Sequence, residues 1–206
     1  MQNVMRLFMN RLLLSIIWLL LAMSSFSQSN LYDEEFTLTF TPTKNSGEWL
    51  FKGKSHSFSI AIFSNKIKTT DSPSYITADK SVIQVMSLPL PKSTLDLNKL
   101  TTAQQKETLE GYVNYELDYF KNEVKINYKK LTKEWVTINS KLWLLWTFDS
   151  SAFNPAEPLA NKPNFQIYAS TICFNQILDI NTPVMKVEVL SKSTELIKKL
   201  MATLKF

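Results

Sequence analysis

His56 and Cys173 are the only histidine and the only cysteine among 206 residues, so nucleophilic catalysis has few side chains to use. A Ser–His–acid triad would have to use His56, but the sequence has no Gly-x-Ser-x-Gly motif to present a nucleophilic serine. We therefore interpret His56 as a surface or strand-edge residue. Cys–His chemistry would need an exposed Cys173 with a lowered thiol pKa. The apolar run 169–174 instead predicts a buried thiol that packs as a small hydrophobic group.

Metal and nucleotide sites also lack their usual residues. One His and one Cys exclude the common tetrahedral zinc sites. Gly53-Lys54-Ser55 is similar to the end of a phosphate-binding loop, but five residues separate Gly47 from Gly53, where that motif has four. We expect a surface turn at Gly53, no metal site and no cofactor.

Carboxylates offer one catalytic alternative. Asp149 follows an apolar strand, and we keep open a periplasmic hydrolase that uses Asp149 with a neighbouring carboxylate or His56. The acidic run Asp33-Glu34-Glu35 lacks the spacing of a calcium loop and is interpreted as a solvated segment. Other acidic pairs lie among lysines of a predicted helix and are interpreted as solvated charges: Glu107/Glu110 and Glu116/Asp118.

Aromatic residues supply the candidates for binding. Trp143, Trp146 and Phe148 fall in an apolar run and are expected in the core. Trp135 alternates with polar residues, which favours a position facing solvent or a groove. Phe153 lies in a proline-containing loop over 150–164, and long loops without regular structure are often functional. Trp135 and Phe153 are therefore the predicted ligand-binding or partner-binding residues.

Residues 1–27 have the pattern of a secretory signal peptide. Arg6 and Arg11 precede the apolar run 12–23, and Ser25 and Ser27 place small residues before a cleavage site at Gln28. The run is shorter than the ~20 apolar residues of a membrane-spanning helix, so we expect no membrane span after cleavage. The sequence predicts export to the periplasm or the cell exterior.

Charge argues against a nucleic-acid partner. The net charge of +5 includes both arginines of the signal segment, so residues 28–206 carry 21 Lys against 18 acidic residues. Arginine is the side chain suited to bidentate contacts with phosphate and guanine. We expect a small ligand or an envelope protein as partner, and no nucleic acid.

Periodicity predicts the elements that must hold these residues. Thr102-Ala103-Gln104-Gln105 fits a capping box at the start of a helix that ends near 124–125, and Ser193 is expected to cap a C-terminal helix. The run 142–148 is apolar on both faces, which predicts a strand covered on both sides. The other predicted strands are 36–40, 58–62, 81–88, 134–138, 165–174 and 176–180.

Short turns between consecutive strands favour antiparallel pairing, so the predicted class is α+β. We expect a mostly antiparallel sheet packed with a long central helix and a C-terminal helix, as an α/β/α sandwich. The predicted organisation is a signal peptide at 1–27, a polar lead-in at 28–35 and a single α+β domain at 36–206.

This element order resembles the PsbP-like group of α/β/α sandwiches, which includes the DcrB-like exported proteins. The resemblance rests on Phe58–Ile62, on Gly111–Leu117 and on Leu196–Phe206. It implies no shared catalytic residues, and members of the group are often accessory or binding proteins. We therefore expect an exported, non-catalytic binding or accessory module that acts through its sheet face or through the loop 150–164.

Overall fold

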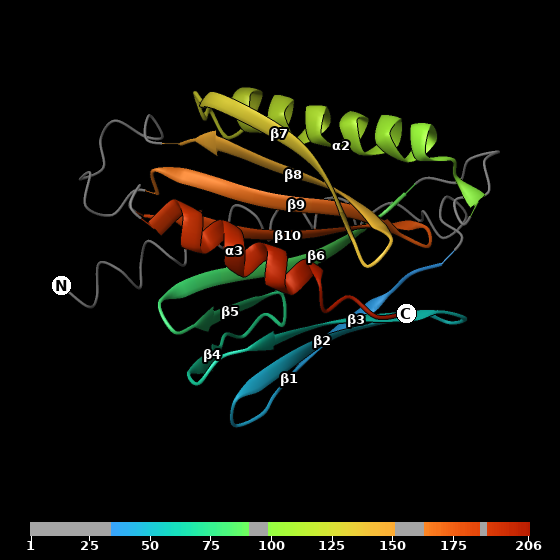
Figure 1. The fold of residues 1–206 in the computed structure, drawn as a ribbon, viewed down its shortest axis with the longest axis vertical. Helices are drawn as coiled ribbons and strands as arrows, with labels where there is room; N and C mark the ends of the chain where they lie inside the picture. The colour runs from blue at the N-terminus through green and yellow to red at the C-terminus, as the bar shows by residue number, and fades with distance from the viewer. Residues whose placement is uncertain (1–33, 91–98, 151–162, 186–188) are drawn as a thin grey trace.

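The computed structural model describes residues 34–90, 99–150, 163–185 and 189–206 (Figure 1). The predicted signal peptide 1–27, the lead-in up to residue 33 and Phe153 lie outside these residues. The helices are α2 (Thr102–Asn122) and α3 (Leu190–Met201). The strands are β1 (Thr37–Pro42), β2 (Ser46–Lys52), β3 (Ser57–Phe63), β4 (Ile67–Thr69), β5 (Tyr75–Ala78), β6 (Ser81–Pro89), β7 (Lys129–Ile138), β8 (Lys141–Asp149), β9 (Phe165–Cys173) and β10 (Gln176–Val184).

Seven strands form one sheet in the order β4-β5-β6-β10-β9-β8-β7, and every neighbouring pair is antiparallel. The remaining three form a smaller antiparallel sheet in the order β1-β2-β3. The C-terminal tail joins the smaller sheet, because the backbones of Ser59 and Lys205 exchange two hydrogen bonds. The fold is α+β with mostly antiparallel strands, as the sequence predicts.

The two helices cover opposite faces of the large sheet (Figure 1). Helix α2 buries Leu109, Val113 and Leu117 against β8 and β9, and α3 packs with the small sheet against the other face. Strand β8 shows both layers, because Trp143 faces the α3 side and Trp146 faces the α2 side. Both indoles are fully buried, which confirms the prediction of a strand covered on both sides.

The smaller sheet contains a strand that the sequence analysis missed. No strand was predicted between 36–40 and 58–62, but Ser46 and Gly47 begin β2. A Cβ at Gly47 would lie 2.2 Å from Cζ of Phe40, so glycine is needed here for the close approach of a ring. The short strands β4 and β5 were also missed, since they are only three and four residues long.

Three element boundaries differ from the predicted ones. The capping box lies one residue earlier, between Thr101 and Gln104. Helix α3 begins at Leu190, so Ser193 is a buried residue of its first turn and the predicted cap is wrong. Strand β10 continues through Pro183 because β6 pairs with it only as far as Asn181, which leaves the proline in the singly paired end.

Neither described helix is long and apolar enough to cross a bilayer.

Candidate functional site

The strongest candidate site is a group of polar side chains on the α2 side of the large sheet. We call it the Asp179 cluster and define it as Asp179 on β10, Ser170 on β9, Trp146 on β8, and Tyr112 and Glu116 on α2. Asp179 and Ser170 are direct cross-strand partners, so their side chains share one face of the sheet. Tyr112 and Glu116 are four residues apart and therefore share one face of the helix.

A chain of hydrogen bonds ends at Asp179. The indole Nε1 of Trp146 donates to Oγ of Ser170 over 3.1 Å, and the Ser170 hydroxyl donates to Oδ1 of Asp179. Asp179 is 1% exposed, yet its Oδ2 has no hydrogen-bond partner. The buried hydroxyl of Tyr112 also has none. A buried polar atom without a partner costs about 1–3 kcal/mol, so each of these two atoms lowers the stability of the native fold.

The environment of the cluster favours neutral carboxyl groups. Burial raises the pKa of Asp179 well above its usual range; the hydrogen bond from Ser170 offsets part of this, and the nearby Glu116 raises it further. Burial likewise raises the pKa of Glu116 to about 7. The pKa of Tyr112 is raised well above 10 by burial and by Asp179 and Glu116. The raised pKa values of Asp179 and Glu116 both favour the neutral carboxyl form, and Glu116, with a pKa of about 7, is close to half ionised at neutral pH.

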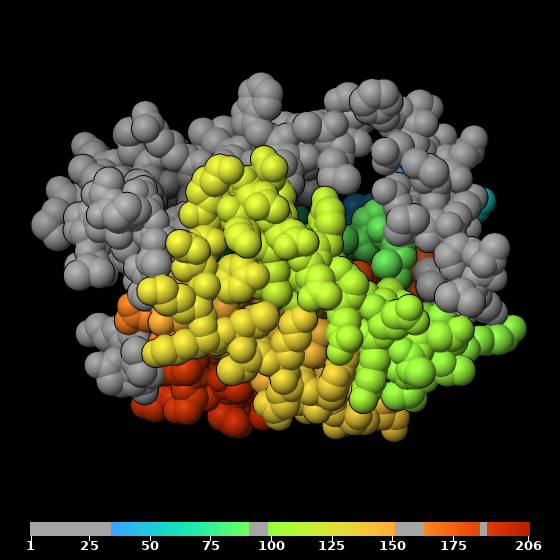
Figure 2. Space-filling model, turned by 90° about the horizontal axis from the view of Figure 1, so that it is seen from above, coloured from blue at the N-terminus to red at the C-terminus, as the bar shows by residue number. Residues whose placement is uncertain are grey.

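Helix α2 covers only part of the sheet face on which the cluster lies. It packs over β8 and β9, whereas Asp179 lies on β10, and no other described helix covers this face of β10. Tyr112 and Glu116 are half-buried and reach solvent. Figure 2 shows the surface hollowed beside α2, with atoms of β6 at the bottom of the hollow. On the same sheet face, Asn181 donates to Oε1 of Gln84 over 2.6 Å.

Glu116 corrects one prediction from the sequence. It was interpreted as a solvated helix charge, but it lies at the helix–sheet boundary with its charge partly desolvated. The spacing to Tyr112, which widens the apolar stripe of the helix, could have indicated this. Asp179 was not singled out at all, although an acidic residue within the apolar segment Ile177–Ile180 was a visible signal.

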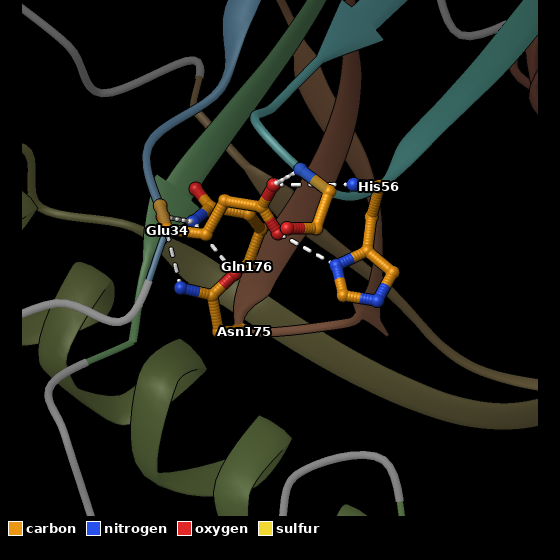
Figure 3. A network of polar contacts seen from close by, with 5 residues as sticks. Glu34, His56, Asn175 and Gln176 are labelled. Atoms are coloured by element: carbon orange, nitrogen blue, oxygen red, sulfur yellow. Dashed lines mark hydrogen bonds and ion pairs between the residues drawn. The ribbon is translucent and has the colours of Figure 1, made fainter.

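A second polar network holds the start of the described chain (Figure 3). One carboxylate oxygen of Glu34 accepts hydrogen bonds from the backbone amides of Ser55 and His56, the latter over 3.1 Å, and the other lies 2.7 Å from Nδ1 of His56. The backbone carbonyl of Glu34 accepts from the side chains of Asn175 and Gln176 over 2.9 and 3.0 Å. The residue is therefore fixed through both its side chain and its backbone.

The loop at Gly53 binds a carboxylate of its own chain. A Cβ at Gly53 would lie 2.5 Å from Oε1 of Glu34, so the glycine makes room for this oxygen. The expected surface turn is confirmed, since the Gly53 amide donates to the carbonyl of His56. The prediction of a solvated acidic segment is wrong for Glu34, whose side chain is 10% exposed.

Glu34→Gln is expected to reduce the amide-exchange protection of Ser55 and His56 by about tenfold, since hydrogen bonds to a charged group contribute ~1.5–3 kcal/mol. Burial pushes the pKa of Glu34 up, but hydrogen bonds from Ser55 and His56 outweigh it and lower the pKa below 4.5. This stabilisation is therefore complete above pH 4.5 and is lost as the pH falls through the lowered value. Hydrogen exchange read by NMR measures the effect.

The matched control is Glu35→Gln, because Glu35 is the exposed neighbour of Glu34. Equal protection in wild type and Glu34→Gln would show that the network does not hold this segment in solution.

His56 cannot act together with Asp149. The ring of His56 stacks on Phe174 with a centroid distance of 4.2 Å, just beyond the end of β9. Asp149 pairs with Phe165 at the other end of that strand. Nine residues of strand span about 30 Å, so the hydrolase that pairs His56 with Asp149 is ruled out by the distance between them.

Cys173 is buried, as the sequence predicts. Burial raises the pKa of its thiol to about 12, although the nearby Lys141 acts to lower it. Since the thiolate is the reactive species, we expect alkylation at pH 8 to be about 1,000-fold slower in the native protein than in urea. A maleimide time course followed by mass spectrometry measures both rates, and comparable rates would contradict the buried position.

Trp135, predicted to bind a ligand or partner, lies on the α2 side of the edge strand β7. Its ring is half-buried against α2, and Nζ of Lys106 lies 5.1 Å from the ring centroid. Its neighbour Lys133 donates to Oδ1 of Asn114 over 2.9 Å. Trp135 therefore contributes to the helix–sheet contact, and its role in binding stays a prediction. Phe153 lies outside the described residues.

Within the described ranges, no three His, Cys, Asp or Glu side chains come together as a metal site.

Comparison with known proteins gives a likeness of overall fold. No family model matches the chain, and no curated protein matches it. Among solved structures, the chain is similar to the solution structure of cyanobacterial PsbP (CyanoP) from Synechocystis sp. PCC 6803, with a TM-score of 0.48 and 6% sequence identity. The match covers 80% of this chain and 94% of that chain. Membership of the PsbP-like group, and of the DcrB-like proteins within it, stays a prediction.

Proposed function

We propose that this protein is a non-catalytic binding module, exported through the segment 1–27, that binds a small ligand at the Asp179 cluster. The observation that carries the proposal is a pair of unpartnered buried atoms on one sheet face, Oδ2 of Asp179 and the hydroxyl oxygen of Tyr112. The third such atom of the described residues, Nε1 of Trp143, lies on the α3 side. Buried polar groups in native proteins nearly always have a partner, and an exception calls for a specific explanation. A ligand that contacts both atoms supplies the missing hydrogen bonds.

The placement of the reactive side chains favours binding over catalysis. His56 is held by Glu34 and Phe174, and Cys173 is buried. Asp179 is held by Ser170 and lies almost entirely out of solvent. Catalysis needs a nucleophile or base within hydrogen-bond reach of a substrate, and the unpartnered atoms of the cluster are instead suited to fixing the position of a bound group.

A thermal-shift screen of small molecules tests the binding proposal. Ligands that raise the melting temperature of the wild type are expected to lose this effect in Asp179→Asn and in Tyr112→Phe. Asp118→Asn and Tyr115→Phe are matched controls, since both residues are exposed on α2 and both changes repeat the same chemistry. If a ligand raised the melting temperature of both cluster variants as much as that of the wild type, it would bind elsewhere, and the proposal would be abandoned.

Export has its own test. Expressed with residues 1–27 in a Gram-negative host, the protein is expected in the periplasmic fraction with Gln28 as its first residue. Intact-mass measurement of that fraction reads the cleavage site. A product that keeps residues 1–27 and stays in the cytoplasmic fraction would contradict export.

A further inference from the structure

We propose that the ligand of the Asp179 cluster is a protonated primary amine, whose ammonium group docks against Oδ2 of Asp179, the carboxylate of Glu116 and the hydroxyl of Tyr112. This inference rests on the proposed binding function and specifies the chemical class of its ligand.

The hydrogen-bonding capacity of the cluster fits an ammonium group. Ser170 already donates to Oδ1 of Asp179, which leaves Oδ2 as the acceptor without a donor. The Tyr112 hydroxyl is a second unused acceptor, and the Glu116 carboxylate lies one helical turn further along α2. An alkylammonium group carries three N–H donors and no acceptor, so its donors match these three oxygens in number.

The charge of the cluster favours a cation. Glu116 lies close enough to Asp179 to disfavour its ionisation, and burial disfavours the ionisation of both. The ion pairs among the described residues join His56 to Glu34 and Lys198 to Glu134, and neither pair includes a carboxylate of the cluster. Two partly desolvated carboxyl groups without a cationic partner form a site that gains most from a bound positive charge.

Aromatic rings add a second source of attraction. Tyr168 stacks on Trp146 with a centroid distance of 4.1 Å, and both rings line the α2 side of the sheet next to Ser170. Tyr112 packs against the same group of rings, so aromatic faces lie near Ser170. Cations bind such faces with about 0.5–2 kcal/mol, which favours an organic ammonium over a strongly hydrated metal ion.

The ligand set is too small for a metal ion. Calcium takes six to eight oxygen ligands and magnesium requires near-ideal octahedral geometry. The cluster offers two carboxyl groups and tyrosine hydroxyls, and no set of three metal-binding side chains is found in the described part of the chain. A primary amine satisfies the same oxygens through hydrogen bonds, without a complete coordination shell.

Binding should depend on pH because the ammonium group requires ionised carboxylates. The titratable groups around the site are Asp179 and Glu116, with the hydroxyls of Tyr112, Tyr168 and Tyr75. The tyrosines stay neutral below pH 9, because burial raises the pKa of each. Alkylamines stay protonated up to about pH 10. The apparent affinity is therefore expected to rise about tenfold between pH 6 and pH 8, as the carboxyl of Glu116 with its pKa of about 7 ionises.

Isothermal titration calorimetry of the full exported chain with n-butylamine and 1,4-diaminobutane tests this inference, with 1-butanol as the neutral probe of similar shape. We expect both amines to bind and 1-butanol not to bind. Titrations at pH 6 in two buffers of different ionisation enthalpy should show release of about one to two protons per amine, because the pKa values of Glu116 and Asp179 are both raised. Asp179→Asn and Glu116→Gln should each weaken binding at least tenfold, and Glu116→Gln should also reduce the rise with pH.

Glu110→Gln and Asp118→Asn are the matched controls on the exposed face of α2 and should bind like the wild type. Circular dichroism verifies that each variant is folded, and the half-exposed position of Glu116 keeps at least one cluster variant informative. The inference would be overturned if 1-butanol bound as tightly as the amines, or if calcium or potassium chloride bound in place of the amines. It would also be overturned if both cluster variants bound the amines with the affinity of the wild type.

The two proposals fail in different ways. If the thermal-shift screen finds a neutral ligand that needs Asp179, the binding function stands and the amine is excluded. If neither the screen nor the titrations find a ligand that needs Asp179, both proposals are wrong.

Discussion

Glu116→Gln is expected to stabilise the protein at alkaline pH. The change that it causes in the free energy of unfolding should be more favourable at pH 8 than at pH 4 by about 3 kcal/mol. Burial raises the pKa of Glu116 from 4.5 to about 7, and each tenfold change in an acid dissociation constant corresponds to ~1.4 kcal/mol. Between these two values the folded protein keeps a proton that the unfolded chain has released, so the stability of the wild type falls as the pH rises. Glutamine has no proton to release, and its variant loses this part of the pH dependence.

Urea unfolding at pH 4 and pH 8 measures this difference for the wild type and the variant. Glu110→Gln is the control, because Glu110 is exposed on the same helix and its replacement should leave the pH dependence unchanged. Parallel stability profiles for wild type and Glu116→Gln would show that the carboxyl of Glu116 is fully solvated, and would remove one acceptor from the Asp179 cluster.

Ser170→Ala is expected to lower the free energy of unfolding by about 2–4 kcal/mol. The Ser170 hydroxyl is fully buried, accepts a hydrogen bond from Nε1 of Trp146 and donates to Oδ1 of Asp179. Alanine leaves both partners buried without a hydrogen bond, and each such group costs about 1–3 kcal/mol. The loss should exceed the effect of deleting an exposed hydroxyl several times over.

Urea denaturation at pH 6 gives this value directly. Ser87→Ala is a suitable control, since Ser87 lies half-exposed on the neighbouring strand β6. A loss below about 0.5 kcal/mol, similar to a typical surface substitution, would mean that water replaces the hydroxyl. The hydrogen-bonded chain from Trp146 to Asp179 would then contribute little to the native fold.

Local sequence was sufficient to predict the long helix and the doubly covered strand. The apolar residues Leu109, Val113 and Leu117 recur at four-residue spacing, and all three are buried on one face of α2. The apolar run of β8 ends at Asp149, as expected. Strand β2 was missed because Gly47 and Gly53 at its two ends are typical of turns, while the burial of Trp49 depends on the packing of the whole small sheet.

The sequence by itself determined the α+β class, the order of most elements and the burial of Cys173, because each follows from the periodicity of neighbouring residues. The tertiary structure alone decided which polar residues meet. Asp179, Ser170 and Glu116 lie on three elements that are brought together by antiparallel register and by the docking of α2. Glu34 meets the amide of Ser55, 21 residues later in the chain. Such contacts depend on long-range packing and leave no period in the sequence, so the Asp179 cluster became visible only in the folded chain.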